Sequence, residues 1–412
     1  MTRSIWWAAG ALVSLAAHAT DAATAEAQAG MGAVTRVEAI AAAIARGPRL
    51  LLAKADSSTA EAVVALARQF DNPNLGIQHT ESTPTEHWTL DVPIDLPWLR
   101  GPRVEAASAA LAAALQRFAF ERAAVAYTAD TSYTRALVNH QRARLSARSA
   151  HDADSLLVLA RLRREAGDAS ELDVQLATVS AGQLTNAAAI DALEATGALL
   201  TLQALMGLPT RAATITLSDS LGVPASVLAA GDGTPLLVAA AEADARASEL
   251  ALVLERRRWL PGISVSAGWE SGDPGGTGNK LLPSFGLAFP IPLFNRNGPA
   301  ILAASAQRDR AAAALTLVRL EQDAALARAQ RTVVVARERQ ARSARLVEGA
   351  QRVAELSLLA YKEGAAALPS ALEAQRTARE AQAQYLDDVA ALRNAAGLVQ
   401  LLTLTTPNRT AP

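Results

Sequence analysis

Apolar side chains occupy every second position in a stretch of the second half of the chain, alternating with glycine and serine. These apolar positions are Ile263, Val265, Ala267 and Trp269. A spacing of two residues is typical of a strand with one apolar face. The same alternation follows a glycine-rich loop, at Phe285, Leu287, Phe289 and Ile291. We therefore predict a β-hairpin over about residues 262–293.

The first half carries a shorter and more polar version of this pattern. Trp88, Leu90, Val92 and Ile94 alternate with polar residues and proline, so we predict a second hairpin over about residues 74–96. The apolar face of such strands can lie on a soluble core, or it can face lipid in a membrane barrel. Four strands are too few to close a barrel, so the membrane interpretation requires several copies of the chain.

Long segments rich in Ala, Leu, Arg, Gln and Glu separate these strands. Residues 103–166 and 300–363 contain no proline, and each follows a Gly-Pro pair, so we predict two continuous helices. At 1.5 Å per residue each would span roughly 95 Å, too long for a compact globule. Return helices are expected at 170–206 and 368–402. Shorter helical segments are expected at about 35–70, where Gly47-Pro48 can interrupt the helix, and at about 234–259.

The two halves of the chain are related by a duplication. Three landmark residues of the first half recur 197 positions further on: Pro93, Gly101 and Pro102 correspond to Pro290, Gly298 and Pro299. The offset also relates Gly167 to Gly364, so neither long helix has gained or lost a residue. We expect a first repeat at 20–207, a connector at 208–233, a second repeat at 234–403 and a tail at 404–412.

Composition and charge exclude several classes of function. The formal net charge is −1, with 39 basic and 40 acidic residues, so nucleic acid and anionic partners are not favoured. The five histidines are scattered (His18, His79, His87, His140 and His151), and there is no cysteine. We find no catalytic constellation, cofactor motif or metal-ligand spacing. The sequence predicts neither an enzyme nor a metalloprotein.

The N-terminus has the pattern of an export signal. An apolar run from Ile5 to Ala17 is followed by Ala17-His18-Ala19, so we expect a signal peptide at 1–19. The absence of cysteine excludes a lipid-modified cysteine after it. Apart from this run, no segment has 18 or more continuous apolar residues.

Two segments resemble the TolC-like outer-membrane efflux factors, and within them the branch that serves heavy-metal pumps. They are FGLAFPIPLFNRNG at 285–298, and YKEG at 361–364 followed by LEAQR at 372–376. The resemblance extends from about residue 34 to 402. It implies a trimer in the outer membrane of a Gram-negative bacterium, with a 12-stranded β-barrel on a 12-helix α-barrel. Its implied partners are a periplasmic adaptor and an inner-membrane pump of the resistance-nodulation-division type.

The resemblance also implies roles for particular residues. Tyr361, Asp173 and Glu373 match positions at the periplasmic constriction, where three copies of Glu373 would form an acidic ring; a glutamate in a first helical turn can equally serve only the helix dipole. Adaptor docking is implied at the small residues of the helix tips: Gly167, Ser170, Gly364 and Ala367. The barrel-to-tunnel transition would contain Pro93, Gly101, Pro102, Pro290, Gly298 and Pro299.

This sequence differs from the family's pattern at two positions that would hold the constriction closed. Ser370 stands where some members carry a second carboxylate, and Ala366 replaces an arginine that links neighbouring helices. The sequence therefore leaves open how the constriction is held closed.

Three functions remain open from the sequence. The first is an exit duct for divalent heavy-metal cations, and the second is the same duct for drugs or organic compounds. The third, from another class, is an exported coiled-coil scaffold or adaptor.

Overall fold

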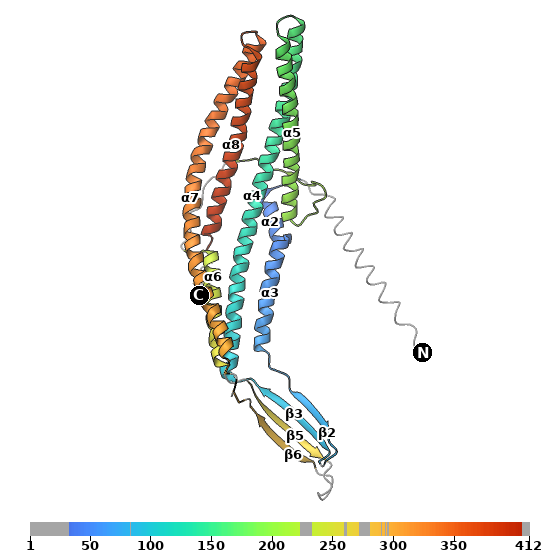
Figure 1. Ribbon diagram of the computed structural model, residues 1–412, viewed down its shortest axis with the longest axis vertical. Coiled ribbons are helices and arrows are strands. Elements are labelled where there is room, and N and C mark those ends of the chain that lie inside the picture. Colours follow the sequence, from blue (N-terminus) through green and yellow to red (C-terminus); the bar gives the residue numbers. More distant parts are fainter. Residues whose placement is uncertain are drawn as a thin grey trace, which may run out of the picture. The chain divides into compact units, whose positions relative to one another are not determined.

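The protein is mainly helical, with a four-stranded antiparallel sheet and a two-stranded parallel one (Figure 1). A computed structural model describes residues 33–82, 84–222, 233–258, 262–271, 281–289, 291–292, 294 and 296–405. The helices are α2 (Arg36–Arg46), α3 (Pro48–Arg68), α4 (Pro97–Glu165), α5 (Glu171–Leu205), α6 (Leu236–Arg257), α7 (Gly298–Lys362) and α8 (Leu368–Thr403). The strands are β1 (Ala33–Val34), β2 (Asn74–His79), β3 (Glu86–Ile94), β4 (Thr216–Leu217), β5 (Ile263–Ser271) and β6 (Leu282–Ala288).

These elements form two compact units. One consists of residues 1–49, 124–229 and 328–401, and the other of residues 50–123, 230–327 and 402–412. The expected signal peptide at 1–19 lies outside the described residues, as do Pro290, most of the tail and ten residues of the connector.

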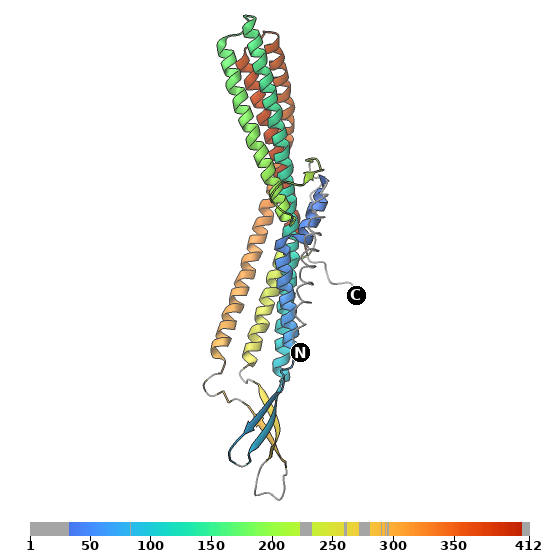
Figure 2. The same ribbon diagram turned by 90° about the vertical axis from the view of Figure 1, so that its right-hand side faces the viewer.

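The unit that begins at residue 50 contains the four-stranded sheet (Figure 2), and its strands have the order β2-β3-β5-β6, as labelled in Figure 1. Its central contact joins the two hairpins: β3 pairs with β5 in antiparallel register, with Trp88 opposite Trp269 and Val92 opposite Val265. The two indole rings stack at 5.9 Å between centroids. β2 and β6 are the outer strands, so each leaves one edge without a partner among the described residues.

The register sorts the side chains of this sheet into two chemically distinct faces. Residues paired across strands share a face. One face is apolar in all four strands, except for His79, Glu86 and Ser271 at one end: Leu75, Ile77, Trp88, Leu90, Val92, Ile94, Ile263, Val265, Ala267, Trp269, Pro283, Phe285 and Leu287. Most of the large apolar side chains in this set are exposed. The opposite face carries mainly polar and small residues, including Asp91, Ser266 and the His87–Glu270 pair at 3.3 Å.

The strand-to-helix passages differ between the two repeats. α7 begins at Gly298 next to Pro299, but α4 begins at Pro97, five residues before Pro102. Pro97 suits a first helical position because its missing N–H would have no partner there. The amides of Leu99 and Arg100 both donate to the Leu96 oxygen, which closes the first turn ahead of Pro102. Pro102 therefore lies inside α4 instead of at its start.

The other unit is a bundle in which α7, α8, α4 and α5 lie side by side in this order (Figure 1). The duplication reproduces one polar contact within each helix pair. Ser146 of α4 donates to Asp191 of α5, and Ser343 of α7 donates to Asp388 of α8, 197 residues further on. Asp388 is 2% exposed and also accepts hydrogen bonds from Arg339 and Gln384. Each long helix is therefore fixed to its return helix by the same serine and aspartate.

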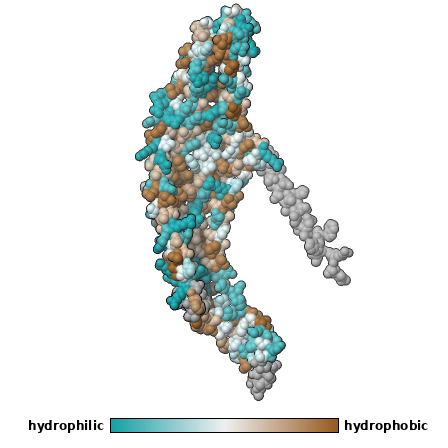
Figure 3. Space-filling view, in the orientation of Figure 1, coloured by the Kyte–Doolittle hydropathy of each residue, from teal (hydrophilic) through white to brown (hydrophobic). Residues whose placement is uncertain are grey.

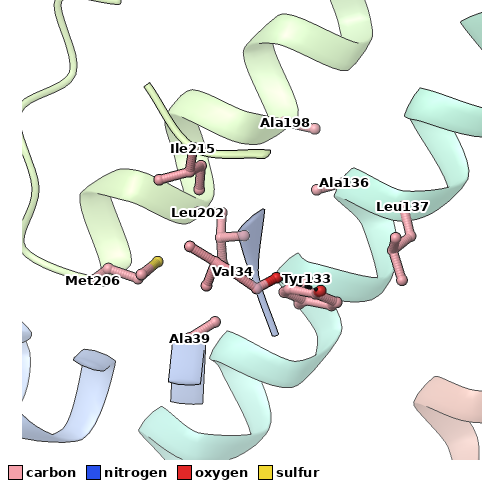
Figure 4. Close-up of a cluster of buried hydrophobic side chains, with 9 residues drawn as sticks. All are labelled: Val34, Ala39, Tyr133, Ala136, Leu137, Ala198, Leu202, Met206 and Ile215. Carbon is pink, nitrogen blue, oxygen red and sulfur yellow. Dashed lines mark hydrogen bonds between the residues drawn. The ribbon is translucent and has the colours of Figure 1, made fainter. Parts of the chain in front are cut away.

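A buried cluster anchors the N-terminal segment on this bundle (Figure 4). Val34, Ala39, Tyr133, Leu202, Met206 and Ile215 are among its members. β1 pairs with β4 of the connector, and the Tyr133 hydroxyl donates to the Val34 oxygen at 2.8 Å. The first connector residues thus pack on the helices.

Candidate functional site

The α4–α5 and α7–α8 turns close their helices with the same backbone motif. Gly167 and Gly364 have φ of +85° and +74°, a left-handed conformation that glycine adopts without steric cost. At the first turn the Asp168 amide donates to the Arg163 oxygen, and at the second the Ala365 amide donates to the Ala360 oxygen. This hydrogen-bond pattern is the Schellman motif. The need to end each helix in this motif is sufficient to explain why glycine occupies both positions.

The return helices begin differently after these turns. Ser170 caps α5 with a reciprocal capping box, in which Ser170 and Asp173 bond each other's backbone amides. In the second repeat the methyl side chain of Ala367 cannot accept a hydrogen bond from the first amides of α8. The Ser370 hydroxyl instead donates to the main-chain oxygen of Ala367 at 2.6 Å. Asp173 therefore has a capping role in addition to any role at a constriction.

Tyr361 lies at the end of α7 and is 3% exposed. It packs with Leu156 and Ala160 of α4 and with Leu368 and Ala371 of α8. Burial raises the pKa of its hydroxyl, an effect that neighbouring Arg163 opposes and Asp173 reinforces. The side chain is thus a neutral core residue of the bundle end.

Arg163 of α4 contacts Tyr361 in two ways. Its guanidinium lies 5.0 Å from the centroid of the tyrosine ring, and its Nη1 donates to the Tyr361 main-chain oxygen at 2.6 Å. Both interactions favour a planar guanidinium over an ammonium group. Our sequence interpretation did not include Arg163, because an arginine in the last turn of a helix needs no function beyond the helix dipole.

A pocket of about 310 Å³ opens between the two turns. Its lining includes Arg163, Asp173 and Tyr361, with the small residues of the second turn. Two of the three residues expected at the constriction, Tyr361 and Asp173, therefore meet in one place.

Glu373, the third expected residue, does not line this pocket. It is exposed on α8 and forms two hydrogen bonds with Arg376, at 2.6 and 2.9 Å, while Arg376 also pairs with Glu380. The bonds from Arg376 hold the pKa of Glu373 below its ordinary value. The Glu373 carboxylate is thus ionised at neutral pH, but it has a cation beside it.

The residues of the expected barrel-to-tunnel passage lie in the unit with the sheet. Pro93 is in β3 opposite Ser264, Gly101 and Pro102 are in the first turns of α4, and Gly298 and Pro299 begin α7. Asn297, just before α7, has φ of +62°, and its side chain donates to Glu255 at the end of α6. Within the described part of the chain, no group of three or more His, Asp or Glu side chains could hold a metal ion.

Comparison with known proteins points to one family. Residues 235–404 match the family model "Outer membrane efflux protein". The chain is 29% identical over 302 residues to the nickel-cobalt-cadmium resistance protein NccC of Alcaligenes xylosoxydans xylosoxydans, a match that covers 68% of the chain and 66% of NccC, slightly under two thirds. It is 26% identical over 367 residues to the cobalt-zinc-cadmium resistance protein CzcC of Cupriavidus metallidurans, with 86% of each protein covered.

The fold is also similar to that of solved outer-membrane channels. The structure of the outer-membrane channel OprN superposes with a TM-score of 0.74 at 19% identity, covering 89% of each chain. At this identity the likeness shows the fold alone.

Proposed function

Because the chain belongs to the outer membrane efflux protein family, whose TolC-like members are channels and not enzymes, we propose that three copies form the exit duct of an efflux pump for divalent heavy-metal cations. The family resides in the outer membrane of Gram-negative bacteria, and its channels are trimeric components of three-part pumps. The number of copies, the partners and the cargo of this chain are our proposal.

The two-faced sheet is the observation that supports a membrane wall most directly. Its apolar face is exposed on all four strands, and its outer edges at β2 and β6 have no partner among the described residues. Unpaired backbone groups are too costly in hydrocarbon, so a sheet enters a membrane only as a closed barrel. Three copies supply twelve strands, which close every edge and leave the polar face toward the lumen.

The same arrangement gives the helices a tunnel. With four long or return helices from each copy, three copies form a ring of twelve helices that continues the lumen. The repeats at 20–207 and 234–403 would then alternate around the ring, and Pro93, Gly101, Pro102, Pro290, Gly298 and Pro299 would mark the passage from barrel to tunnel.

The helix turns are the proposed contact for a periplasmic adaptor. Gly167, Ser170, Gly364 and Ala367 present little side-chain volume there, so a partner helix hairpin can approach the backbone closely. The adaptor would connect this end to an inner-membrane pump of the resistance-nodulation-division type, which selects the substrate. Tyr361, Asp173 and Glu373 would lie at the constriction.

Divalent cations are the proposed cargo because NccC and CzcC are named for nickel, cobalt, zinc and cadmium resistance. The absence of a three-ligand group among the described residues is compatible with this role, since conduction requires that ions not be held tightly.

Growth of a deletion strain tests the proposal. We expect the strain without this chain to lose tolerance to zinc, cobalt, cadmium or nickel, and the restored gene to recover it. A loss confined to dyes and organic solvents would replace the cargo with organic compounds. Recovery of the protein as a soluble periplasmic monomer would instead support a scaffold and refute the duct.

A further inference from the structure

On the polar face of the four-stranded sheet, a histidine and a glutamate meet at the end next to the hairpin loops. His87 of β3 lies directly opposite Glu270 of β5, and the His87 Nδ1 atom is 3.3 Å from the Glu270 Oε1 atom. Their side chains are 27% and 35% exposed, so both are partly buried yet reachable from solvent. The space-filling view shows hydrophilic residues among apolar ones over the sheet (Figure 3). The two residues come from different hairpins, so sequence spacing could not bring them together.

Thr80, in the loop of the first hairpin, determines which nitrogen of His87 carries a hydrogen. The Thr80 hydroxyl donates to the main-chain oxygens of Ser82 and Pro84, at 2.9 and 3.0 Å. The same hydroxyl oxygen lies 3.4 Å from the His87 Nε2 atom. Because its one hydrogen is engaged by the two carbonyl oxygens, the hydroxyl accepts a hydrogen from Nε2. The other ring nitrogen, Nδ1, is the one that faces Glu270.

A neutral His87 with its hydrogen on Nε2 presents a lone pair on Nδ1 to the Glu270 carboxylate. Two acceptor atoms 3.3 Å apart repel each other unless a cation lies between them. A proton on Nδ1 satisfies this condition, and so does a metal ion. Two zinc bonds of about 2.1 Å at a tetrahedral angle place their ligand atoms about 3.4 Å apart. The pair is thus already spaced for a metal ion, and a hydrogen bond from the second ring nitrogen is what commonly orients a metal-bound histidine.

The sheet holds these two side chains in place and leaves space beside them. Trp88 and Trp269, the next cross-strand pair, stack on the opposite face with ring centroids 5.9 Å apart, which fixes the register of β3 on β5. On the polar face, the next row contains Gly268, where a Cβ would lie 2.2 Å from the Trp88 main-chain oxygen. No side chain from this position can cover the pair. An ion can therefore enter and leave the pair from this side.

We propose that His87 and Glu270 together bind a divalent transition-metal cation, which displaces the Nδ1 proton to solvent. An imidazole nitrogen with a carboxylate oxygen favours zinc, cobalt or nickel over magnesium and calcium, which prefer oxygen ligands alone. The two protein ligands leave the remaining coordination positions to water, so the ion exchanges readily. The position of this site on the path of the cargo rests on the proposed function, in which the polar face lines the lumen and three copies contribute three pairs at one level.

Calorimetric titration with zinc tests the site on the full-length, detergent-solubilised protein, prepared without a histidine tag and in excess magnesium. Thr80→Val keeps both ligands but removes the acceptor for Nε2, and it should weaken zinc binding by roughly tenfold. His87→Asn and Glu270→Gln each remove a ligand and should weaken binding further. The matched control is His79→Asn, because His79 lies opposite Glu86 at the same end of the sheet but on the other face. It should bind zinc as the unaltered protein does.

Circular dichroism and size-exclusion chromatography confirm that each variant is folded before the titrations are compared. Zinc binding by the His87→Asn and Glu270→Gln proteins that equals that of the unaltered protein overturns the site. So does a loss of binding in the His79→Asn protein as large as that in the His87→Asn protein. Affinity for magnesium equal to that for zinc overturns the assignment to a transition metal.

Planar-bilayer recordings test the position of the site separately. Zinc added on the side of the hairpin loops should reduce the potassium current through the unaltered and His79→Asn channels, and should leave the current through the His87→Asn channel unchanged. Zinc that binds in solution but does not change the current of the unaltered protein overturns the position on the path and leaves the site standing. Absence of channels in the bilayer refutes the proposed duct, whereas the calorimetric titration decides the site in either case.

Discussion

The guanidinium of Arg163 lies over the ring of Tyr361 and donates to its main-chain oxygen, joining the ends of the two long helices at the pocket between the turns. The expected constriction residues include Tyr361, whereas position 366 holds alanine. Arg163 thus supplies a cation to this pocket from α4.

Arg163→Ala is therefore expected to loosen the end of the helical bundle. The variant loses a charge-assisted hydrogen bond and a cation–π contact, together about 2–3 kcal/mol for partly buried groups. In single-channel recordings we expect higher conductance and more frequent open events. Arg163→Lys should be intermediate, because an ammonium cannot stack and donate as a planar fork does.

Arg164→Ala is the matched control for charge, since Arg164 is adjacent and pairs with Glu171 at the surface. It should behave as the unaltered protein. Equal effects of both alanine variants would show that charge at the turn, and not the contact with Tyr361, sets the conductance.

Substitution of Glu373 tests the proposed acidic ring. We expect Glu373→Gln to lower cation selectivity and Arg376→Gln to raise it, because Arg376 neutralises part of the glutamate charge. Reversal potentials in a salt gradient measure both. Unchanged values in the Glu373→Gln protein would dismiss the ring.

The pH dependence of that selectivity follows from the same pair. Arg376 lowers the pKa of Glu373 below its ordinary value of 4.5, so the carboxylate charge is present above that pH and is lost only as the pH falls through the lowered value. Removing Arg376 should move the loss of selectivity to higher pH. A titration that is the same with and without Arg376 would contradict this assignment.

Asp388 and Asp387 are adjacent, but their substitution should have unequal effects on stability. Asp388→Ala leaves Ser343 without its acceptor in the buried contact between α7 and α8, which should cost about 2–3 kcal/mol. Asp387→Ala removes a more exposed pair and should cost less than about 1 kcal/mol. Thermal and denaturant unfolding of the detergent-solubilised protein give the comparison, and equal losses would show that burial is not the deciding factor.

Three of the four tyrosines should ionise late in alkaline titration. Burial raises the pKa of Tyr127, Tyr133 and Tyr361 above 10.0. Their contribution to stability is complete below the unfolded pKa and is lost as the pH rises through the folded value. Ultraviolet absorbance of tyrosinate should show the late group in the folded protein only, and Tyr361→Phe should reduce its amplitude.

The alternation and the proline-free helical composition were sufficient to predict the two hairpins and the long and return helices, because both are local signals. They did not predict the short strands β1 and β4, whose pairing joins residues about 180 positions apart. The residues at which helices begin were harder to predict from the sequence. Pro102 was expected at the start of a helix, but Pro97 serves that position five residues earlier, and either proline satisfies the same rule. The alternating pattern predicted a strand as far as Ile291, but β6 ends at Ala288. Ala288 pairs with Ser264, the second residue of β5, so β5 offers almost no further residues with which β6 could pair.

Only part of the candidate site could be predicted from the sequence. Resemblance named Tyr361 and Asp173, which meet at one pocket, but sequence spacing could not bring in Arg163, since its contact with Tyr361 spans 198 residues. Nor could it show that Arg376, one turn beyond Glu373, bonds that carboxylate, because side-chain conformation decides this. Roles at the constriction and at the adaptor contact stay predictions.

The open edges of β2 and β6 have a consequence for the biogenesis of the protein. A single copy has two strand edges without a partner among the described residues, together with an exposed apolar sheet face, and an extended peptide can add to such an edge. In the proposed trimer these edges are paired, so a copy that has not yet assembled exposes both of them, and we expect such a copy to aggregate more readily than the assembled protein.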